Sequence, residues 1–325
     1  MTPYPTEIFS VHSIPTPTVF PVGPANIHLF TGPPITLFDA GTNTEEAFQA
    51  LLEGLDSAGI ALADIEQVIL THHHLDHVGL VRRIKDASGA KVLTHSSIPE
   101  QMPFMFNISA MRDHMARLLA ELGAPASVVD AAIEQRLRLS WLYDAATVDE
   151  TFESGDQIGP FTAHFRPGHS STDTVFTHNA GGWAVTGDHL IHRVTPSPLL
   201  RRYAADGKRE KSLVQYHKSL LSTRALEINW CFAGHGIPFQ NHRQAIDDTL
   251  QHLERRGDRM LRALPPGGAT PYEMTLRIFP HVNTASLYYC LSTTTGHLEL
   301  LEEEGKAYST VENGFLRFHP RFPQA

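Results

Sequence analysis

The stretch Thr71-His72-His73-His74-Leu75-Asp76-His77 (THHHLDH) carries more information about the fold than any other part of this chain. It follows the apolar run Val68-Ile69-Leu70, which predicts a short buried strand. An ordinary soluble core has no need for four histidines and an aspartate within seven residues. Imidazole and carboxylate groups bind borderline divalent cations such as zinc. We therefore interpret the stretch as a metal-binding loop at the end of a strand.

The composition indicates a globular protein with an excess of acidic residues. The chain has 325 residues, 42% of them hydrophobic, which is enough for one large domain and a second small one. It carries 26 Lys+Arg and 35 Asp+Glu, a net charge of -9, which disfavours nucleic acid as a partner unless a local basic patch is present. With Cys231 and Cys290 as its two cysteines, it predicts neither a disulfide framework nor a cysteine-rich zinc cluster.

The N-terminal segment predicts no targeting or membrane element. Residues 1–17 contain no basic region followed by a continuous apolar region, so a secretory signal is not expected. The uncharged stretch 8–38 contains six prolines, which exclude a membrane-spanning helix and instead indicate strands and turns ending at Asp39-Ala40-Gly41. We expect a cytoplasmic protein with no membrane partner.

The chain then alternates between strands and helices, which is typical of an α/β fold. Strands are predicted at 65–70, 91–94, 161–165, 174–177, 183–186 and 230–233, and helices at 44–58, 80–88 and 212–221. The interval 97–149 is mostly helical, and we interpret it as an insertion that packs over the scaffold or the mouth of its active site. Its apolar residues 102–106 and Met111 are expected to form part of a substrate pocket.

Three later strands end in the same way as the first. Each predicted strand leads through a small-residue turn to a histidine or aspartate, namely Pro167-Gly168-His169, Gly187-Asp188-His189 and Gly234-His235-Gly236. Glycine lets the backbone bend sharply at such turns. We therefore expect the polar side chains to point into a common cleft beyond the strand ends.

This ordered set of motifs resembles the metallo-β-lactamase superfamily of metallohydrolases over roughly residues 8–240. The resemblance implies an αββα sandwich, in which two β-sheets lie back to back with helices outside, and a dinuclear metal site along one edge. It assigns His72, His74 and His169 to the first metal, Asp76, His77 and His235 to the second, and Asp188 to both as a bridging carboxylate. We therefore expect a catalytic domain at 1–245 with the helical insertion at 97–149.

Two metals in such a site suit hydrolysis. Cations about 3.5–4 Å apart share a water, lower its pKa toward neutrality and present hydroxide to a carbonyl or phosphoryl centre. Asp76 would orient this hydroxide, and Asp188 would hold the two metals together. We expect two zinc ions, although iron or manganese accepts the same ligands. Asp39 is a candidate for fixing a ligand histidine, and a turn-forming aspartate is an equally good interpretation of it.

Three further histidines lie beside these ligands in the sequence. His73 alternates with the ligands and is expected to point away from the metals. His189 and His192 follow the bridging aspartate and are candidates for lining the pocket.

The C-terminal segment 246–325 predicts a second domain. Helices are expected to begin at His252, Thr270 and Leu287, followed by a hairpin of 307–310 and 314–318. This order resembles the winged-helix-like domain appended to one branch of these hydrolases. Acidic residues outnumber basic ones in the segment, and the third helix is itself acidic, which disfavours DNA binding. We favour a packing or dimerising module, so a homodimer is among the expected assemblies.

The leading interpretation is hydrolysis of an ester-like bond in a small molecule, namely a thioester, carboxylic ester or lactone. Glyoxalase II has similar metal motifs, but we find no counterpart here of its glutathione-binding helices and basic residues. The alternative is a metal-dependent single-strand endoribonuclease or phosphodiesterase. RNA would require the basic cluster Arg193, Arg201, Arg202, Lys208, Arg209 and Lys211, which could instead hold an anionic cofactor tail. A third interpretation, an inactive metal-binding scaffold, is disfavoured by the complete ligand set.

Overall fold

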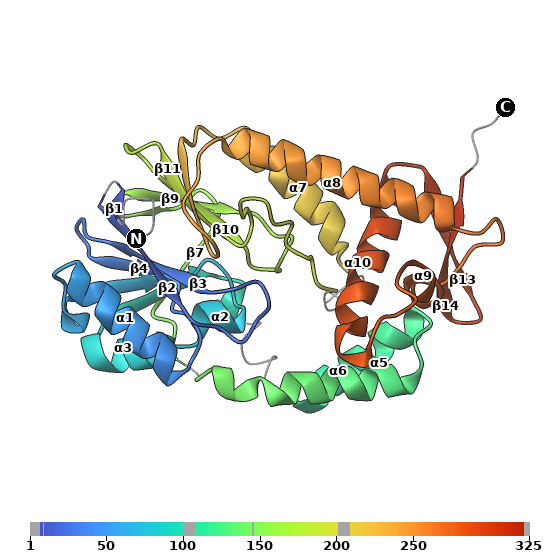
Figure 1. The fold of residues 1–325 in the computed structure, drawn as a ribbon, viewed down its shortest axis with the longest axis horizontal. Coiled ribbons are helices and arrows are strands. Elements are labelled where there is room, and N and C mark those ends of the chain that lie inside the picture. The colour runs from blue at the N-terminus through green and yellow to red at the C-terminus, as the bar shows by residue number, and fades with distance from the viewer. Residues whose placement is uncertain (1–6, 9, 100–107, 145, 201–208, 322–325) are drawn as a thin grey trace. The chain divides into compact units, whose positions relative to one another are not determined.

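The computed structural model describes the chain except for residues 1–6, 9, 100–107, 145, 201–208 and 322–325 (Figure 1). The chain divides into two compact units. Unit 1 consists of residues 1–102, 140–196 and 220–246, and unit 2 of residues 103–139, 197–219 and 247–325. Within the described residues, the structure contains no helix that is long and apolar enough to cross a membrane.

Unit 1 contains two β-sheets. The first sheet has the strand order β1 (Glu7–Ile8), β2 (Val11–Thr16), β3 (Ala25–Phe30), β4 (Thr36–Phe38), β5 (Gln67–Ile69), β6 (Lys91–His95) and β7 (Glu150–Phe152). Its neighbours are antiparallel up to β4 and parallel from β4 to β7. The second sheet has the order β12 (Trp230–Ala233), β11 (Trp183–Gly187), β10 (Thr174–His178), β9 (Phe161–Phe165) and β8 (Gln157–Ile158). The predicted mixed α/β architecture is confirmed.

Helices of unit 1 lie on the outer face of the first sheet. They are α1 (Glu45–Ser57), the 3-10 turn Leu62–Asp64, α2 (Leu75–Val78) and α3 (Val81–Ser88), and a second 3-10 turn spans Ser140–Leu142. The hydroxyl of Thr44 accepts a hydrogen bond from the backbone N–H of Ala47 and caps α1, at the predicted start of this helix. Leu51 and Ile84 are fully buried against Leu37 and Val68 of the sheet.

A second core lies between the two sheets. Phe38 and Ile69 of the first sheet pack against Phe161, Phe176 and Trp183 of the second, and all five side chains are almost completely buried. The rings of Phe38 and Phe161 meet edge to face, with centroids 4.9 Å apart. Because alternate residues of a strand point to opposite faces, β4 contributes Leu37 to the outer core and Phe38 to this one.

Unit 2 is mainly helical. It contains α5 (Ile108–Glu121), α6 (Ala126–Arg138), α9 (Pro271–Ile278), α10 (Thr284–Glu303) and the hairpin of β13 (Ala307–Glu312) and β14 (Phe315–Pro320), while α7 (Ser212–Arg224) and α8 (His242–Ala263) contribute residues to both units. Thr270 and Glu273 form the capping box of α9. The helices that we expected to be an insertion in the catalytic domain, α5 and α6, pack in unit 2 with Leu287 and Leu291 of α10.

Two details of unit 2 differ from the sequence-based expectations. The helix predicted to begin at His252 begins at His242, because Ile246, Leu253 and Met260 recur at helical spacing on one buried face. Met111, expected to line a pocket, is buried in the core of unit 2 beside Leu118. Residues 102–106, the rest of that expected pocket, lie outside the described residues.

Candidate metal centre

The strand directions bring the predicted ligands to one edge of unit 1. In the first sheet, β4 and β5 are parallel, so Asp39 and the THHHLDH loop leave the sheet at the same edge. In the second sheet, β9, β11 and β12 all run in one direction, since β10 is antiparallel to β9 and β11 and β12 is parallel to β11. His169, Asp188 and His235 therefore follow strand ends at one edge as well.

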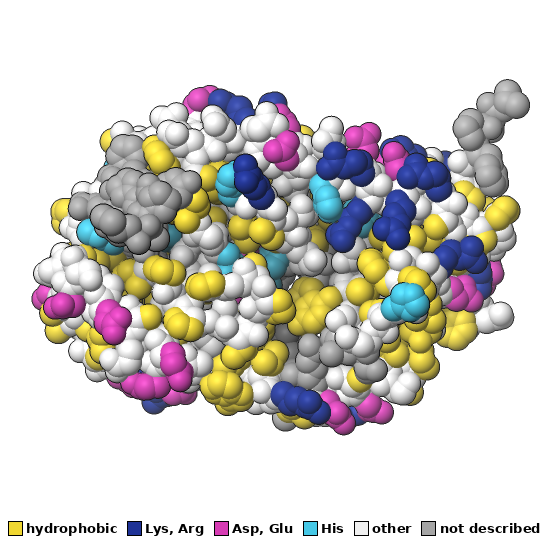
Figure 2. All heavy atoms as spheres, viewed as in Figure 1, with side chains coloured by type: hydrophobic (Ala, Val, Ile, Leu, Met, Phe, Trp, Pro, Cys, Tyr) yellow, Lys and Arg dark blue, Asp and Glu magenta, His cyan; other side chains and the backbone are white. Residues whose placement is uncertain are grey.

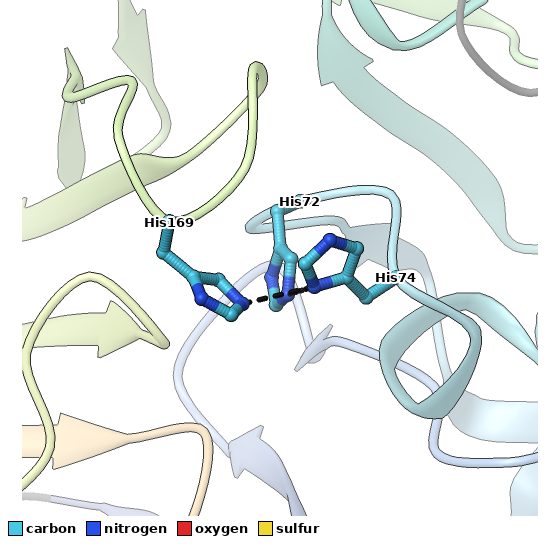
Figure 3. A group of neighbouring side chains, drawn as sticks. All are labelled: His72, His74 and His169. Carbon is cyan, nitrogen blue, oxygen red and sulfur yellow. Dashed lines mark hydrogen bonds between the residues drawn. The ribbon is translucent and has the colours of Figure 1, made fainter. Parts of the chain in front are cut away.

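The first ligand group consists of His72, His74 and His169. Figure 3 shows their rings turned toward one another from two different loops. Nδ1 of His74 lies 3.1 Å from Nε2 of His72 and 2.9 Å from Nε2 of His169. The three imidazole nitrogens converge although His74 and His169 are 95 positions apart in the chain. Converging nitrogens of this kind could bind a cation.

The second ligand group consists of Asp76, His77 and His235, and all three are buried. Oδ2 of Asp76 lies 3.4 Å from Nε2 of His235 and 3.8 Å from Nε2 of His77. These separations exceed a normal hydrogen bond between such atoms. The three side chains therefore surround a common point without bonding directly to one another.

Asp188 lies between the two groups. Its Oδ2 is 3.5 Å from Nε2 of His169 in the first group and 3.5 Å from Nε2 of His235 in the second. Its Oδ1 is 3.6 Å from Nε2 of His77. Position 234 requires glycine, because a Cβ there would lie 2.2 Å from Oδ1 of Asp188.

Asp39 fixes the orientation of His77 in the second group. His77 donates from Nδ1 to Oδ2 of Asp39 over 2.9 Å, which directs its Nε2 toward the site. The backbone N–H and the hydroxyl of Thr71 both donate to the same carboxylate, each over 2.8 Å. Asp39 has a left-handed backbone with a φ of 64°, so it also forms the turn after its strand. The two interpretations of this residue from the sequence are therefore compatible.

His235 is held by residues that the sequence did not single out. Its Nδ1 donates to the carbonyl of Pro24 over 2.8 Å. The side-chain amide of Asn26 donates to the carbonyls of Ala233 and Gly236, on either side of the His235 turn. Since these partners lie more than 200 positions apart, no local pattern could have identified them.

His73 points to a different partner from its neighbours. Its backbone N–H donates to the hydroxyl of Thr172 over 3.2 Å, and its Nδ1 lies 2.7 Å from the same oxygen. The backbone N–H of Ser170 donates to Asp173 over 2.8 Å. Thr172 therefore connects the THHHLDH loop to the loop that carries His169, and Asp173 stabilises that second loop internally.

The pKa values show that this edge of the sheets favours positive charge. Burial lowers the pKa of His77, but the carboxylates of Asp188, Asp76 and Asp39 outweigh it and raise the pKa to about 9. Burial is likewise outweighed at His235, where Asp188 and Asp76 raise the pKa to about 10. His72, buried and surrounded by other imidazoles, has a pKa well below its ordinary value.

The donor atoms fit a pair of divalent cations. In the part of the chain that the structure describes, four buried atoms of the site residues have no hydrogen-bond partner: Nε2 of His77, Nε2 of His235, Oδ1 of Asp188 and Nδ1 of His169. Buried polar atoms are rarely left without a partner unless a ligand or ion supplies one. Imidazole and carboxylate donors also match the preferences of zinc, iron and manganese.

The two other histidines near Asp188 take separate positions. His189 is buried, its Nε2 lies 2.8 Å from the hydroxyl of Thr223, and burial lowers its pKa to about 3. His192 is exposed and stacks on Phe239 with ring centroids 5.3 Å apart. Their role in lining a pocket stays a prediction.

Comparisons with known proteins agree with this geometry. The sequence model of the metallo-beta-lactamase superfamily matches residues 21–259. The "Probable metallo-hydrolase YqjP" of Bacillus subtilis (strain 168) is 32% identical over 316 residues, which cover 95% of this chain and 97% of that protein.

Two solved structures have the same fold. The metallo-beta-lactamase family protein TTHA1429 from Thermus thermophilus superposes with a TM-score of 0.79 and 25% identity, covering 97% of this chain and 99% of that one. A beta-lactamase domain protein from Burkholderia ambifaria superposes with a TM-score of 0.73 and 19% identity, covering 95% and 92%. The second likeness concerns the fold alone. With the family match spanning most of the sequence and the Bacillus protein aligned over nearly its full length, this chain belongs to the metallo-beta-lactamase superfamily and is a metallohydrolase.

Proposed function

We propose that this metallohydrolase holds two divalent metal ions and cleaves an ester-like bond in a small molecule. The bond is a thioester, a carboxylic ester or a lactone. His72, His74 and His169 would hold one ion, Asp76, His77 and His235 the other, and Asp188 would bind both. Zinc is the proposed metal, and iron or manganese would suit the same donors.

The position of Asp188 supports this proposal most strongly. One of its oxygens is 3.5 Å from a histidine nitrogen of each ligand group. A carboxylate equidistant from two sets of donors can neutralise positive charge at both and hold the two sets at a fixed separation. Two separate mononuclear sites would not require an acid at this point.

The protein's own groups supply binding, orientation and a dry environment. When bound, two such ions lower the pKa of a water and polarise a carbonyl oxygen. Asp76, whose Oδ2 lies 3.4 Å from Nε2 of His235, can accept a hydrogen bond from the attacking water and orient it. The buried carboxylates of Asp188 and Asp39 hold the histidines in place while charge develops on the substrate during the reaction.

The alternative, cleavage of single-stranded RNA, has less support. RNA binding would need free basic groups near the metals, and the described members of the expected basic cluster include two that are paired. Arg209 forms an ion pair with Glu299, and Lys211 forms one with Glu302 at 2.8 Å. Arg201, Arg202 and Lys208 lie outside the described residues. We therefore propose a small-molecule substrate rather than a nucleic acid.

We also propose that the C-terminal helices and hairpin are a winged-helix-like packing or dimerising module. The acidic residues of α10 are used inside unit 2, where Glu303 pairs with Lys218 at 2.7 Å and Glu304 with Lys306 at 2.9 Å. A helix whose charges are paired in this way does not present a surface to phosphates.

Metal analysis and a substrate panel test the proposed function together. Wild-type protein purified without added metal should contain close to two equivalents of divalent metal per chain. It should hydrolyse at least one of acyl-glutathione, acyl-CoA, an aryl ester and a lactone in preference to single-stranded RNA. A single equivalent would contradict the dinuclear site, and preferential RNA cleavage would contradict the substrate class.

The matched variant is Asp188→Asn, which keeps the shape of the side chain and removes its charge. We expect its kcat/KM to fall by about a hundredfold or more, because an electrostatic group at the reacting centre is lost. The metal content should fall below that of wild type. Asp86→Asn, which removes an exposed charge beside Arg82, should change neither quantity. Unchanged activity in Asp188→Asn would remove this residue from the mechanism.

A further inference from the structure

Helix α8 carries a basic face within unit 2 that is separate from its acidic face. The pKa of Lys306 is raised by its hydrogen bond to Glu304 and also by the charges of Asp258 and Glu254, so these two acids of α8 face that lysine. At 3.6 residues per turn, another set of α8 side chains projects from a different side of the helix: His252, Arg256 and Arg259. Figure 2 shows Lys and Arg side chains gathered over the C-terminal half of α8, with Asp and Glu side chains beside them.

Arg256 has no counter-charge on this face. Its side chain is half-buried, and burial lowers its pKa. Among the residues that the structure describes, it forms no ion pair and no hydrogen bond. The neighbouring Arg259 reaches a backbone carbonyl, that of Ile278, at 3.5 Å. A partly desolvated guanidinium without an acceptor is costly, so such an arrangement indicates that an anion belongs beside it.

Helix α10 adds a buried imidazole to the same place. The two helices contact each other, since Met260 of α8 shares a buried cluster with Leu298 and Leu301 of α10, and a Cβ on Gly257 would lie 3.7 Å from Leu301. One turn before Leu301, His297 is 1% exposed, and its Nδ1 has no hydrogen-bond partner in the described part of the chain. Burial together with the charges of Arg256 and His252 lowers the pKa of His297 to about 3, so the ring is neutral and can donate one N–H.

We propose that α8 and α10 form an oxyanion-binding site for inorganic phosphate or the phosphate group of a small molecule. Arg256 and Arg259 would supply guanidinium groups, which match the geometry of phosphate oxygens, and His252 and His297 would supply ring N–H donors. The site is separate in sequence from the metal ligands, and it does not depend on the proposed hydrolysis. Because its buried member, His297, and its half-buried member, Arg256, lie at a helix packing surface, the site suits one small anion rather than a polymer.

Calorimetric titration of the metal-loaded full chain with inorganic phosphate, at constant ionic strength, tests the proposal. Arg256→Gln should weaken one phosphate-binding event by about tenfold or more, because charge-assisted hydrogen bonds to phosphate are lost. The matched control is Arg255→Gln, which removes the same charge from the next residue, an exposed side chain that donates to Gln251. The control should change the affinity less than twofold or so. Phosphate bound at the metal centre would persist equally in both variants.

Unchanged binding in Arg256→Gln, or equal losses in both variants, would overturn the proposal. Thermal melting in chloride buffer checks that Arg256→Gln folds, and Arg259→Gln provides a second variant with the same expectation if it does not. Parallel titrations with adenosine 5′-monophosphate and a single-stranded oligonucleotide distinguish the sources of phosphate. Tighter binding of the nucleotide than of phosphate supports a phosphorylated small molecule. Oligonucleotide binding that depends equally on Arg255 and Arg256 would show a polyanion surface and overturn the proposal.

Discussion

The two groups of predicted ligands in the candidate metal centre differ in how they are supported. In the group of Asp76, His77 and His235, each histidine donates from Nδ1 to a fixed oxygen, that of Asp39 for His77 and that of Pro24 for His235. In the group of His72, His74 and His169, Nδ1 of His72 lies 3.0 Å from the hydroxyl of Thr71, but Nδ1 of His169 has no hydrogen-bond partner within the described residues. His74 and His169 are also less buried than the members of the other group.

This difference indicates which group is the more rigid. A histidine whose other ring nitrogen is hydrogen-bonded keeps its orientation without a metal. It therefore loses less conformational freedom when a metal binds. The group of Asp76, His77 and His235 also contains a carboxylate of its own, whereas the other group shares only Asp188. We therefore expect it to release its metal last during removal by a chelator. Three substitutions test this expectation.

Gly234→Ala should have the largest effect, because it disturbs both groups. Its Cβ would lie 2.2 Å from Oδ1 of Asp188 and 2.7 Å from Cε1 of His77, so one of these side chains must move. We expect a loss of about 1–3 kcal/mol in the free energy of unfolding and of most bound metal. Chemical denaturation and metal analysis measure the two effects.

The control for that variant is Gly257→Ala in α8, where a Cβ makes an ordinary contact of 3.7 Å with Leu301. Alanine is the better helix former, so stability should stay the same or rise by up to about 1 kcal/mol. Full metal content in Gly234→Ala would show that the Asp188 carboxylate is not confined as the structure indicates.

Asp39→Asn should have an intermediate effect, larger in the better supported group, because Asp39 contacts His77 directly and reaches His72 only through Thr71. Asparagine keeps the shape of the side chain but removes the charge that orients His77. Loss of such a supporting carboxylate weakens metal binding by about 10–100-fold. Stepwise removal by a chelator, followed by metal analysis, should show one of the two metals released earlier than in wild type. Equal weakening of both metals would contradict the comparison, and Asp86→Asn provides the surface control.

Thr172→Val should have the smallest effect and act on the other group. It removes the hydroxyl that accepts from the backbone of His73 and thereby loosens the link between the two loops of His74 and His169. One neutral hydrogen bond contributes about 0.5–1.5 kcal/mol, so metal affinity should fall by about threefold to tenfold. Competition with a chromogenic chelator measures this change.

Thr42→Val is the matched control for that variant. Thr42 is fully buried, and within the described residues its hydroxyl has no hydrogen-bond partner, so valine should be tolerated with wild-type metal affinity. If Thr172→Val also keeps wild-type affinity, the link between the loops has no role in metal binding.

Short-range sequence patterns were sufficient to predict most of the strands and helices that carry the site. The apolar runs before His72, Asp188 and His235 are strands, and Gly187 and Gly236 form turns at the last two. Thr44 and Thr270 cap the helices that the sequence predicted. Such features depend on neighbours within a few residues, which is the range over which turns and caps act. The beginning of α8 at His242 was missed because burial, not propensity, extends that helix.

The packing of unit 2 could not be inferred in the same way. The sequence predicted helices in 97–149 but placed them in the catalytic domain, whereas residues 103–139 form one compact unit with 247–325. The acidic residues of α10 disfavoured DNA binding but did not reveal their partners, and Glu299 is buried against Arg209. In both cases the partners lie far apart in the chain, and amphipathic pattern shows which face is apolar without showing what covers it.

The donor types, their order and their placement after strands follow from the amino-acid sequence, because metal-binding chemistry requires particular side chains and glycine turns are local. The tertiary structure alone decided which atoms meet. It placed Asp188 between the two histidine groups, Asp39 behind His77, and Asn26 around the His235 turn. The contacts between the sheets, such as those of Asn26 with Ala233 and of His77 with Asp188, result from the two sheets packing face to face through the buried rings of Phe38, Phe161 and Phe176. That packing sets distances between residues more than a hundred positions apart, and no short-range pattern encodes them.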